Sequence, residues 1–457
     1  MRNTTMEGVN KISKHIFLGE RRTSLIKKNI IASFLIKGWS AMVQFLLVPL
    51  TLACLGEYEN GVWLTISSVL LWINNLDIGL GNGLRNKLAV YMARGDKDKA
   101  REMVSSTFIM LCIIIIPVLM VLLLLETCCD NYRIFNVDSS IIGNLDVVLY
   151  VTTILVCATF IFKFIGNFYM GLQLPAVNNF IGSAGSTLAL LGTYIVYLSG
   201  NRSMLLVASV NLLAPLLVYL LAYPITFLGK YKFLSPSINY IKASSIRELF
   251  SIGFKFFALQ IPAVLLFFTS NILISKLFNP AMVTPYQIAY RYFVMTMTLF
   301  SIICVPYWTA TTDAYEKRDF EWIRRANHTL NRFVLLLFFI IVCMILLSGP
   351  VYSVWIGDKS DVPFSMTVIA GIYQFLLIYS MRYSYVLNGI GALRLQLIFT
   401  ILAAALYIPL AMLVGHLTHD INYLLLVMCV VHIPGLVVNI IQYHKIMNGT
   451  AKGIWIK

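Results

Sequence analysis

The chain has 457 residues, of which 59% are apolar and 12% are charged, and its mean hydropathy is +0.81. A soluble domain carries about 25% charged residues, so this composition excludes a large water-facing surface and predicts an integral membrane protein. The net charge of +15 is explained by membrane topology and by attraction to anionic headgroups, and it does not indicate a nucleic-acid partner.

Apolar runs long enough to cross a membrane recur along the whole chain. A spanning helix needs about 20 apolar residues, and charged residues, Pro, Gly and Asn bound the runs. Twelve spanning helices are predicted, at residues 29–52, 60–80, 104–125, 146–165, 177–199, 203–227, 249–277, 285–310, 331–349, 365–386, 394–414 and 421–441. No stretch remains that could form a sizeable soluble domain.

The charged connections are distributed unevenly between the two sides of the membrane. If the N-terminus is cytoplasmic, 26 of the 35 Lys and Arg residues lie in cytoplasmic segments and three lie in external connections. This positive-inside bias predicts that both termini are cytoplasmic. Membrane lipids are the expected partners of the basic segments.

The two halves of the chain repeat one pattern. Lys37 in the first predicted span and Lys255 in the seventh are 218 residues apart, and the basic segments at Tyr91 and Tyr315 are 224 residues apart. These similar offsets predict two six-helix lobes related by an axis along the membrane normal. The predicted units are a cytoplasmic segment (1–28), an N-lobe (29–230) and a C-lobe with a short cytoplasmic tail (231–457).

Six cations fall inside predicted spans, at Lys37, Lys163, Lys255, Lys276, Arg291 and Arg382. A charge in the middle of a bilayer costs at least about 2.5 to 3.5 kcal/mol, so each cation needs a route to the interface or a hydrated cavity. Lys163, Lys276 and Arg382 lie near span ends, where their side chains are expected to snorkel. The other three lie about two turns inside their helices and indicate a hydrated cavity.

Polar side chains extend from the deeper cations along their helices. The stripe on the first span consists of Lys37, Ser40, Gln44 and Thr51, and the stripe on the eighth consists of Arg291, Thr298 and Ser301. Steps of three, four and seven residues place such side chains on one helical face. On the seventh span, Gln260 and Asn271 share a face, which Lys255 joins if Pro262 bends the helix. Contacts between helices through small polar residues are the alternative explanation.

One clear acid, Asp77, lies within the spans, close to Arg85 and the cytoplasmic surface. A cavity with this excess of cations attracts anions and repels cations. The charge pattern therefore favours a phosphate-bearing substrate, whose oxygens accept charge-assisted hydrogen bonds from Lys and Arg.

A glycine-rich motif occupies the cytoplasmic end of the second predicted span. Residues 74–87 read NNLDIGLGNGLRNK, and the third glycine of a dinucleotide fingerprint would fall on Leu84, so this is not a nucleotide site. The pattern Asp-x-Gly-x-Gly-Asn-x-x-Arg-Asn, followed by Ala-Arg-Gly-Asp at 93–96, resembles the polysaccharide exporter (Wzx-type O-antigen flippase) branch of the multidrug/oligosaccharidyl-lipid/polysaccharide (MOP) exporter superfamily. The resemblance is specific over about residues 30–105.

The resemblance implies an all-helical, MATE-like protein with two six-helix lobes around a V-shaped central cavity. Similar proteins rock their lobes and move undecaprenyl pyrophosphate-type lipid-linked oligosaccharides across the bacterial cytoplasmic membrane, for surface polysaccharide synthesis. No catalytic role, cofactor or metal site is expected, and coupling to a proton or sodium ion stays open. Other polysaccharide-assembly membrane proteins are compatible partners.

The residues expected to bind substrate in the cavity are Lys37, Gln44, Lys255, Gln260, Asn271 and Arg291. Those expected to brace the turn after the second span are Asp77, Gly79, Gly81, Asn82 and Arg85. Two other functions stay open. One is a MATE-type antiporter of drugs or cations, and the other is a membrane-embedded polysaccharide polymerase or ligase, although the longest external loop, 126–144, is short for such an enzyme.

Overall fold

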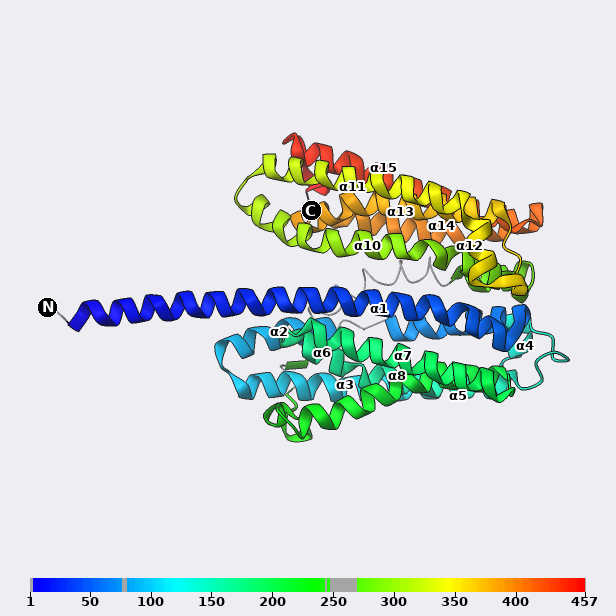
Figure 1. Cartoon of the computed structure of the whole chain (residues 1–457), viewed down its shortest axis with the longest axis horizontal. Coiled ribbons are helices and arrows are strands. Elements are labelled where there is room, and N and C mark those ends of the chain that lie inside the picture. The colour runs from blue at the N-terminus through cyan, green and yellow to red at the C-terminus, as the bar shows by residue number, and fades with distance from the viewer. Residues whose placement is uncertain (1–2, 76–79, 243–244, 247–268, 457) are drawn as a thin grey trace.

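The computed structural model describes residues 3–75, 80–242, 245–246 and 269–456, which form helices and their connections. Within these ranges, nine helical stretches are long and apolar enough to cross a membrane. The predicted class, an all-helical membrane protein with two lobes, is confirmed (Figure 1). Most of the seventh predicted span lies outside the described residues.

The N-lobe is formed by the helices that precede the linker at 228–246. They are α1 (Asn3–Asn75), α2 (Leu80–Arg94), α3 (Lys97–Cys128), α4 (Asn131–Phe135), α5 (Leu145–Phe162), α6 (Phe164–Gly171), α7 (Pro175–Ser199) and α8 (Met204–Phe227). The fourth predicted span is divided at Lys163 into α5 and α6. Two short 3₁₀ turns, η1 (Lys232–Leu234) and η2 (Ile238–Tyr240), lie in the linker.

The C-lobe is formed by the elements after the linker. They are a helical stretch at 269–277, η3 (Pro280–Met282), α10 (Val283–Glu316), α11 (Phe320–Leu346), α12 (Ser348–Trp355), η4 (Gly357–Lys359), α13 (Phe364–Ile390), α14 (Arg394–Thr418), α15 (Ile421–Met447) and η5 (Gly453–Trp455). The helix α11 starts eleven residues before the predicted span at 331, because the Asp319 carboxylate caps it by accepting from Trp322 N.

The helix α1 contains both the first and the second predicted spans. It is reversed at Gly56, whose φ of 69° and ψ of −178° define a conformation that is essentially restricted to glycine. The chain therefore turns back at this residue, as Figure 1 shows. Since no proline precedes Pro49, the helix also extends back through the predicted N-terminal segment to Asn3.

The connections define two ends of the molecule. We call the end with the connections at 94–97, 228–246, 316–320 and 447–456 the basic end, and the end with the turn at Gly56 the opposite end. At the basic end the linker is fixed to α3, because Arg101 Nε donates to Ser235 O at 3.1 Å and Lys242 forms an ion pair with Glu102.

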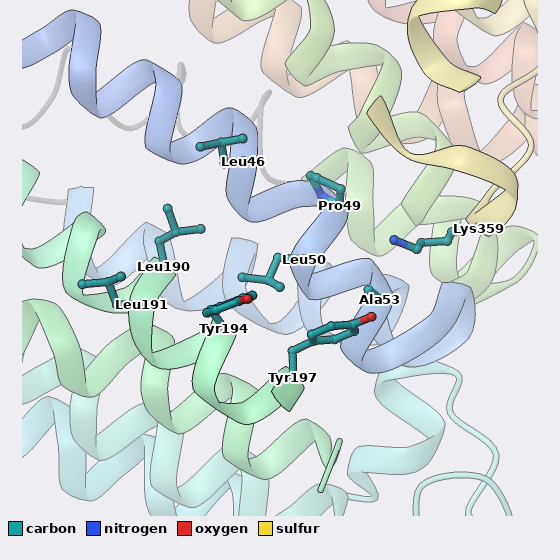
Figure 2. Close-up of a pocket in the computed structure, with 9 residues that line it drawn as sticks. All are labelled: Leu46, Pro49, Leu50, Ala53, Leu190, Leu191, Tyr194, Tyr197 and Lys359. Atoms are coloured by element: carbon teal, nitrogen blue, oxygen red, sulfur yellow. The ribbon is translucent and has the colours of Figure 1, made fainter. Parts of the chain in front are cut away.

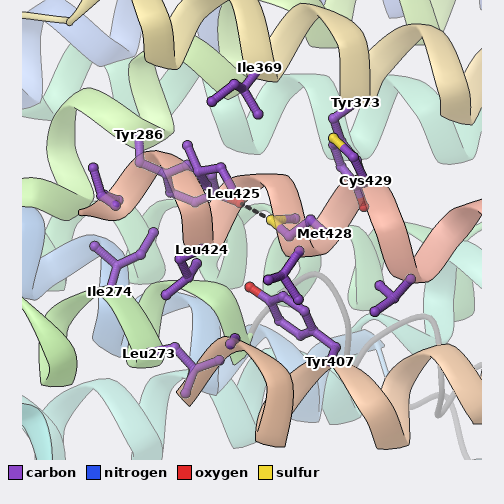
Figure 3. Close-up of a cluster of buried hydrophobic side chains, with 14 of the residues drawn as sticks. Leu273, Ile274, Tyr286, Ile369, Tyr373, Tyr407, Leu424, Leu425, Met428 and Cys429 are labelled. Atoms are coloured by element: carbon purple, nitrogen blue, oxygen red, sulfur yellow. Dashed lines mark hydrogen bonds between the residues drawn. The ribbon is translucent and has the colours of Figure 1, made fainter. Parts of the chain in front are cut away.

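Each lobe has its own buried core, in which apolar side chains from neighbouring helices interdigitate. Figure 3 shows part of the C-lobe core, where the Tyr286 hydroxyl lies 3.9 Å from Met428 Sδ. The fully buried Tyr407 forms a 2.8 Å hydrogen bond with Ser270. Close packing of this kind holds helices together in lipid, where little hydrophobic driving force acts between them.

The two lobes are joined in the half of the molecule toward the opposite end. Asn60 Nδ2 donates to Thr284 Oγ1 at 3.2 Å, and Thr284 donates to Glu57 O at 2.7 Å. Further bonds join Ser275 to Phe135 O, Asn136 to Ser275 O, Ser360 to Glu57, Asn271 to Leu64 O and Trp355 to Phe45 O. Closure at this end determines where a cavity between the lobes can remain.

Candidate functional site

A cavity of about 470 Å³ lies between α1 of the N-lobe and α10 of the C-lobe. Its lining consists of Lys37, Ser40, Ala41, Gln44, Phe45, Gln287, Tyr290, Arg291, Val294, Met295 and Thr298. Apart from Phe45, which is itself in contact with Trp355, these residues lie on the basic-end side of the contacts that join the lobes. The cavity is therefore placed between the lobes and closed off from the opposite end.

The structure brings the two predicted polar stripes together. Lys37, Ser40 and Gln44 line the cavity from α1, and Arg291 and Thr298 line it from α10. Their spacings of three, four and seven residues keep each set on one helical face. The convergence of these residues on one cavity makes it the candidate site.

The electrostatics of the cavity are cationic. Lys37 is exposed and Arg291 is partly buried, and none of the described residues that line the cavity is acidic. Low-dielectric walls focus the field of such charges, so the cavity attracts anions. The helix α1 is held against α7 by bonds from Trp39 to Thr187 at 2.9 Å and from Gln44 to Ser186 at 3.4 Å, which orients the stripe.

Asn271 lies at a different place from the one expected of a substrate ligand. It is 3% exposed, donates to Leu64 O at 3.2 Å and accepts from Gln287 Nε2 at 2.7 Å. It thus joins the lobes and contacts the cavity through Gln287. Sequence reasoning missed Gln287, although its position four residues before Arg291 places both on one helical face.

The predicted stripes are shorter than expected. Thr51 is 7% exposed and donates to carbonyls of its own helix, and Ser301 likewise donates to Thr298 O. Neither is among the lining residues. Beyond Phe45, α1 packs Val48 and Leu52 into a C-lobe core, which excludes the cavity from that part of the helix.

The other predicted residues lie elsewhere. Lys255, Gln260, Asp77 and Gly79 fall outside the described residues, as does the side chain of Asn82. Gly81 is buried and Arg85 is exposed, and both belong to the helix α2 at the basic end. Gly81 and Arg85 therefore lie within a helix and not in the turn that they were expected to brace.

The expectation that Arg382 snorkels to the interface is wrong. Its side chain is 4% exposed and lies inside the C-lobe among Asn331, Tyr379 and Tyr383. Neutral acceptors and aromatic faces in the helices around it let the guanidinium remain buried. Lys276 is exposed and Lys163 is partly buried.

A second, largely apolar groove of about 440 Å³ lies along α1 toward the opposite end (Figure 2). Its lining consists of Leu46, Pro49, Leu50, Ala53, Leu190, Leu191, Tyr194, Tyr197 and Lys359. Several of these side chains are exposed, including Leu46, Leu191 and Tyr194. The groove begins at Leu46, two residues after the cavity residue Gln44, so the same helix lines both. Sequence reasoning did not predict it.

The side chains of the described site do not suit a metal ion. Within residues 3–75, 80–242 and 269–456, no three His, Cys, Asp or Glu side chains are placed to hold one. What the described site offers a ligand is therefore cations, amides, hydroxyls and aromatic rings, which bind through charge, hydrogen bonds and stacking.

The fold consists of two helical bundles with a cavity between them. No family model and no curated protein matches the chain. Among solved structures it is similar to an inward-facing multidrug resistance MATE family transporter of the MOP superfamily, with a TM-score of 0.76 and 14% identity over 92% of this chain and 98% of that chain. The chain thus has the MATE fold, which the resemblance implied.

Two further structures give the same assignment of fold. A MATE protein in the straight conformation has a TM-score of 0.63 and 16% identity, over 93% of this chain and 96% of that chain. An outward-facing MATE family transporter of the MOP superfamily has a TM-score of 0.62 and 14% identity, over 94% and 97%. Two of these three structures are described as multidrug resistance MATE family transporters. The TM-score is 0.76 for the inward-facing structure and 0.62 for the outward-facing one.

Proposed function

We propose that the chain is an exporter that moves an anionic lipid-linked oligosaccharide across the bacterial cytoplasmic membrane by alternating access. The observation that carries the proposal is the cavity between the lobes, in which Lys37 and Arg291 converge with no acid among the lining residues. In this proposal the basic end faces the cytoplasm and the described state is open toward it.

The cationic lining suits a lipid pyrophosphate. Lys and Arg form charge-assisted hydrogen bonds with phosphate oxygens, and the guanidinium of Arg291 can present two donors in parallel. Gln44, Gln287 and Thr298 add neutral donors and acceptors within the same cavity, which are suited to sugar hydroxyls. Phe45 and Tyr290 offer ring faces beside them.

The apolar groove along α1 supports the lipid-linked part of the proposal. A polyprenyl chain must remain in an apolar environment while its headgroup enters a polar cavity. The groove offers exposed Leu46, Leu191 and Tyr194 along the same helix that carries Lys37 and Gln44. The headgroup and the chain of one substrate can therefore contact α1 at the same time.

A second candidate function is antiport of drugs or other cations, since the similar solved structures include multidrug resistance transporters. The aromatic and apolar lining residues Phe45, Tyr290 and Met295 favour it. Lys37 and Arg291 oppose it, because two cations in one cavity repel a cationic drug. The sign of the cavity therefore separates the two functions.

The test is export of surface polysaccharide in a bacterial strain that lacks its own flippase. We expect Lys37→Gln and Arg291→Gln to abolish export while the protein still inserts, and Lys37→Arg to retain part of it. Losing one charge-assisted hydrogen bond of about 1.5 to 3 kcal/mol weakens phosphate binding by roughly ten- to a hundredfold. The control is Lys276→Gln, which removes an exposed cation that does not line the cavity.

Two results would contradict the proposal. One is full export by the Lys37→Gln/Arg291→Gln double variant at normal membrane abundance, measured by immunoblot. The other is that the wild-type protein makes an efflux-deficient strain resistant to cationic dyes, and that Lys37→Gln increases this resistance. The second result would instead support the antiport function.

A further inference from the structure

A second cationic cavity lies inside the C-lobe, away from the cavity between the lobes. It has a volume of about 350 Å³ and lies among α11, α13 and α15 toward the basic end. Its lining consists of Arg324, Asn327, His328, Asn331, Tyr379, Arg382, Tyr443, His444, Met447 and Asn448. None of these residues is acidic, and nothing in the export proposal uses them.

The inner part of this C-lobe cavity contains a buried guanidinium. Arg382 is 4% exposed, and its Cζ lies 4.7 Å and 4.2 Å from the ring centroids of Tyr379 and Tyr383. It donates hydrogen bonds to Asn331 Oδ1 and to the Tyr383 hydroxyl, while its Nε has no partner among the described residues. The described partners of Arg382 are neutral, so its buried positive charge would be stabilised by an anion.

The mouth of the C-lobe cavity is also rich in donors. Arg324 is exposed, and one of its terminal nitrogens donates to Met447 O at 2.6 Å. That carbonyl belongs to the last residue of α15, so the bond fixes Arg324 at the negative end of a helix. His328 and His444 are exposed beside it. Donors thus extend from solvent to Arg382.

Arg382 lies a short distance inside the basic end of the C-lobe. Arg382 lies eight residues before Ile390, the end of α13, which is roughly 12 Å at 1.5 Å per residue. The polar headgroup layers add about 10 to 15 Å in total to a hydrocarbon core of about 30 Å. With the end of α13 at the membrane surface, Arg382 would lie near the boundary between the headgroups and the hydrocarbon, close to the level of lipid phosphates.

We propose that the C-lobe cavity binds a phosphate group, supplied by an anionic phospholipid of the membrane. Planar guanidinium groups match the geometry of phosphate oxygens, and basic pockets between spanning helices suit anionic lipid headgroups. The bound phosphate would accept from Arg382 and Arg324 and so link α11, α13 and α15. Free phosphate presents the same oxygens, so the two sources must be separated experimentally.

The test measures how ligands change the unfolding temperature of the purified, delipidated full chain in detergent. Dioleoylphosphatidylglycerol, dioleoylphosphatidylcholine and inorganic phosphate are titrated separately. We expect the phosphatidylglycerol to raise the unfolding temperature, and Arg324→Gln to weaken its apparent affinity by about ten- to a hundredfold. Arg325→Gln is the matched control, because Arg325 is the next residue of α11, is exposed and does not line the cavity.

Further variants and native mass spectrometry make the result decisive. Arg382→Lys keeps the charge but lacks the planar fork, and should retain fewer phosphatidylglycerol molecules than the wild type. An Arg324-dependent shift with inorganic phosphate alone would support the phosphate site and identify a soluble ligand as its source. Equal responses of Arg324→Gln and Arg325→Gln to phosphatidylglycerol and to inorganic phosphate would overturn the proposal, whatever the export activity of these variants.

Discussion

The two halves of the interface between the lobes differ in chemistry. Toward the opposite end, neutral side chains and backbone carbonyls form hydrogen bonds, such as Asn271 to Leu64 O at 3.2 Å and Ser275 to Phe135 O at 2.8 Å. Toward the basic end, the same two lobes present Lys37 and Arg291 to a cavity. Neutral bonds contribute about 0.5 to 1.5 kcal/mol each, so a rocking motion can break them one after another.

Packing contacts in the closed half are also made by uncharged groups. The rings of Phe45 and Trp355 stack with centroids 3.9 Å apart, and Trp355 also donates to Phe45 O at 3.0 Å. At the tip, Gly61 of α1 faces the backbone of Pro280 in η3, where an added Cβ would lie 1.8 Å from Pro280 O. In the closed half the lobes are therefore held by close packing, whereas the cavity half presents charged side chains.

The largest expected effect in this comparison comes from Gly61→Ala. Because the methyl group would collide with backbone atoms, the lobes cannot close at the opposite end without shifting. Overpacking of this kind costs about 1 to 3 kcal/mol, and we expect the variant to favour states that are open there. The control is Gly38→Ala on the same helix, where the added Cβ would meet nothing within 4 Å.

The measurement for Gly61→Ala is the distance between spin labels on the two lobes. Ser139 of the N-lobe and Asp358 of the C-lobe are exposed at the opposite end and suit labelling, once the native cysteines have been replaced. Longer distances in Gly61→Ala than in Gly38→Ala are expected, together with loss of export. An unchanged distance distribution would show that Gly61 does not limit closure.

A smaller effect in the same direction is expected from Asn271→Ala. The substitution removes the bond to Leu64 O and the 2.7 Å bond from Gln287. Because Gln287 lines the cavity, its amide can find another partner there, and the loss should be about 0.5 to 1.5 kcal/mol. Ser68→Ala is the control, because that hydroxyl donates within α1 to Thr65 O. If Asn271 instead contacts substrate directly, export would fall while the label distances stay unchanged.

Much of this comparison could be predicted from the sequence. The span pattern predicted the helices on both sides of the interface, because lipid requires long apolar helices. Helical periodicity also predicted that Lys37, Ser40 and Gln44 share a face, and that Arg291 and Thr298 share another. Those positions depend on local geometry within one helix, and the resemblance implied a central cavity between the two lobes.

The remaining features depend on contacts between segments far apart in the chain. Thr51 continues the periodicity of Lys37, yet it is buried where α1 packs against the C-lobe. Arg382 lies near a helix end, as snorkelling residues do, yet Tyr379 and Tyr383 hold it inside the bundle. The residue pattern of a single helix cannot predict contacts with other segments. The close approach of Gly61 to Pro280 could not be predicted for the same reason.

The smallest effect is expected from Asp138, in the loop that bonds to the C-lobe at the opposite end. Ser140 donates to its carboxylate from both N and Oγ, at 2.8 and 2.7 Å, and these bonds lower the pKa of Asp138 below its ordinary value of 3.8. A carboxylate whose pKa is lowered by folding stabilises the native state above its unfolded pKa, and this stabilisation is lost as the pH falls through the native pKa. The contribution of Asp138 should therefore be constant between pH 5 and 8 and decrease below about pH 4.

The check for Asp138 is the unfolding temperature of the purified protein in detergent as a function of pH. Asp138→Asn should lower this temperature slightly at pH 7 and should flatten its decline below pH 4, since the amide does not titrate. Ser140→Ala removes the hydroxyl donor and should act in the same direction. The label distances should stay as in the wild type at pH 7, because the bonds of Asn136 and Ser275 across the interface remain. A change of the unfolding temperature between pH 5 and 8 that Asp138→Asn abolishes would contradict a lowered pKa of Asp138. The loop would then respond to charge, as the cavity half of the interface does.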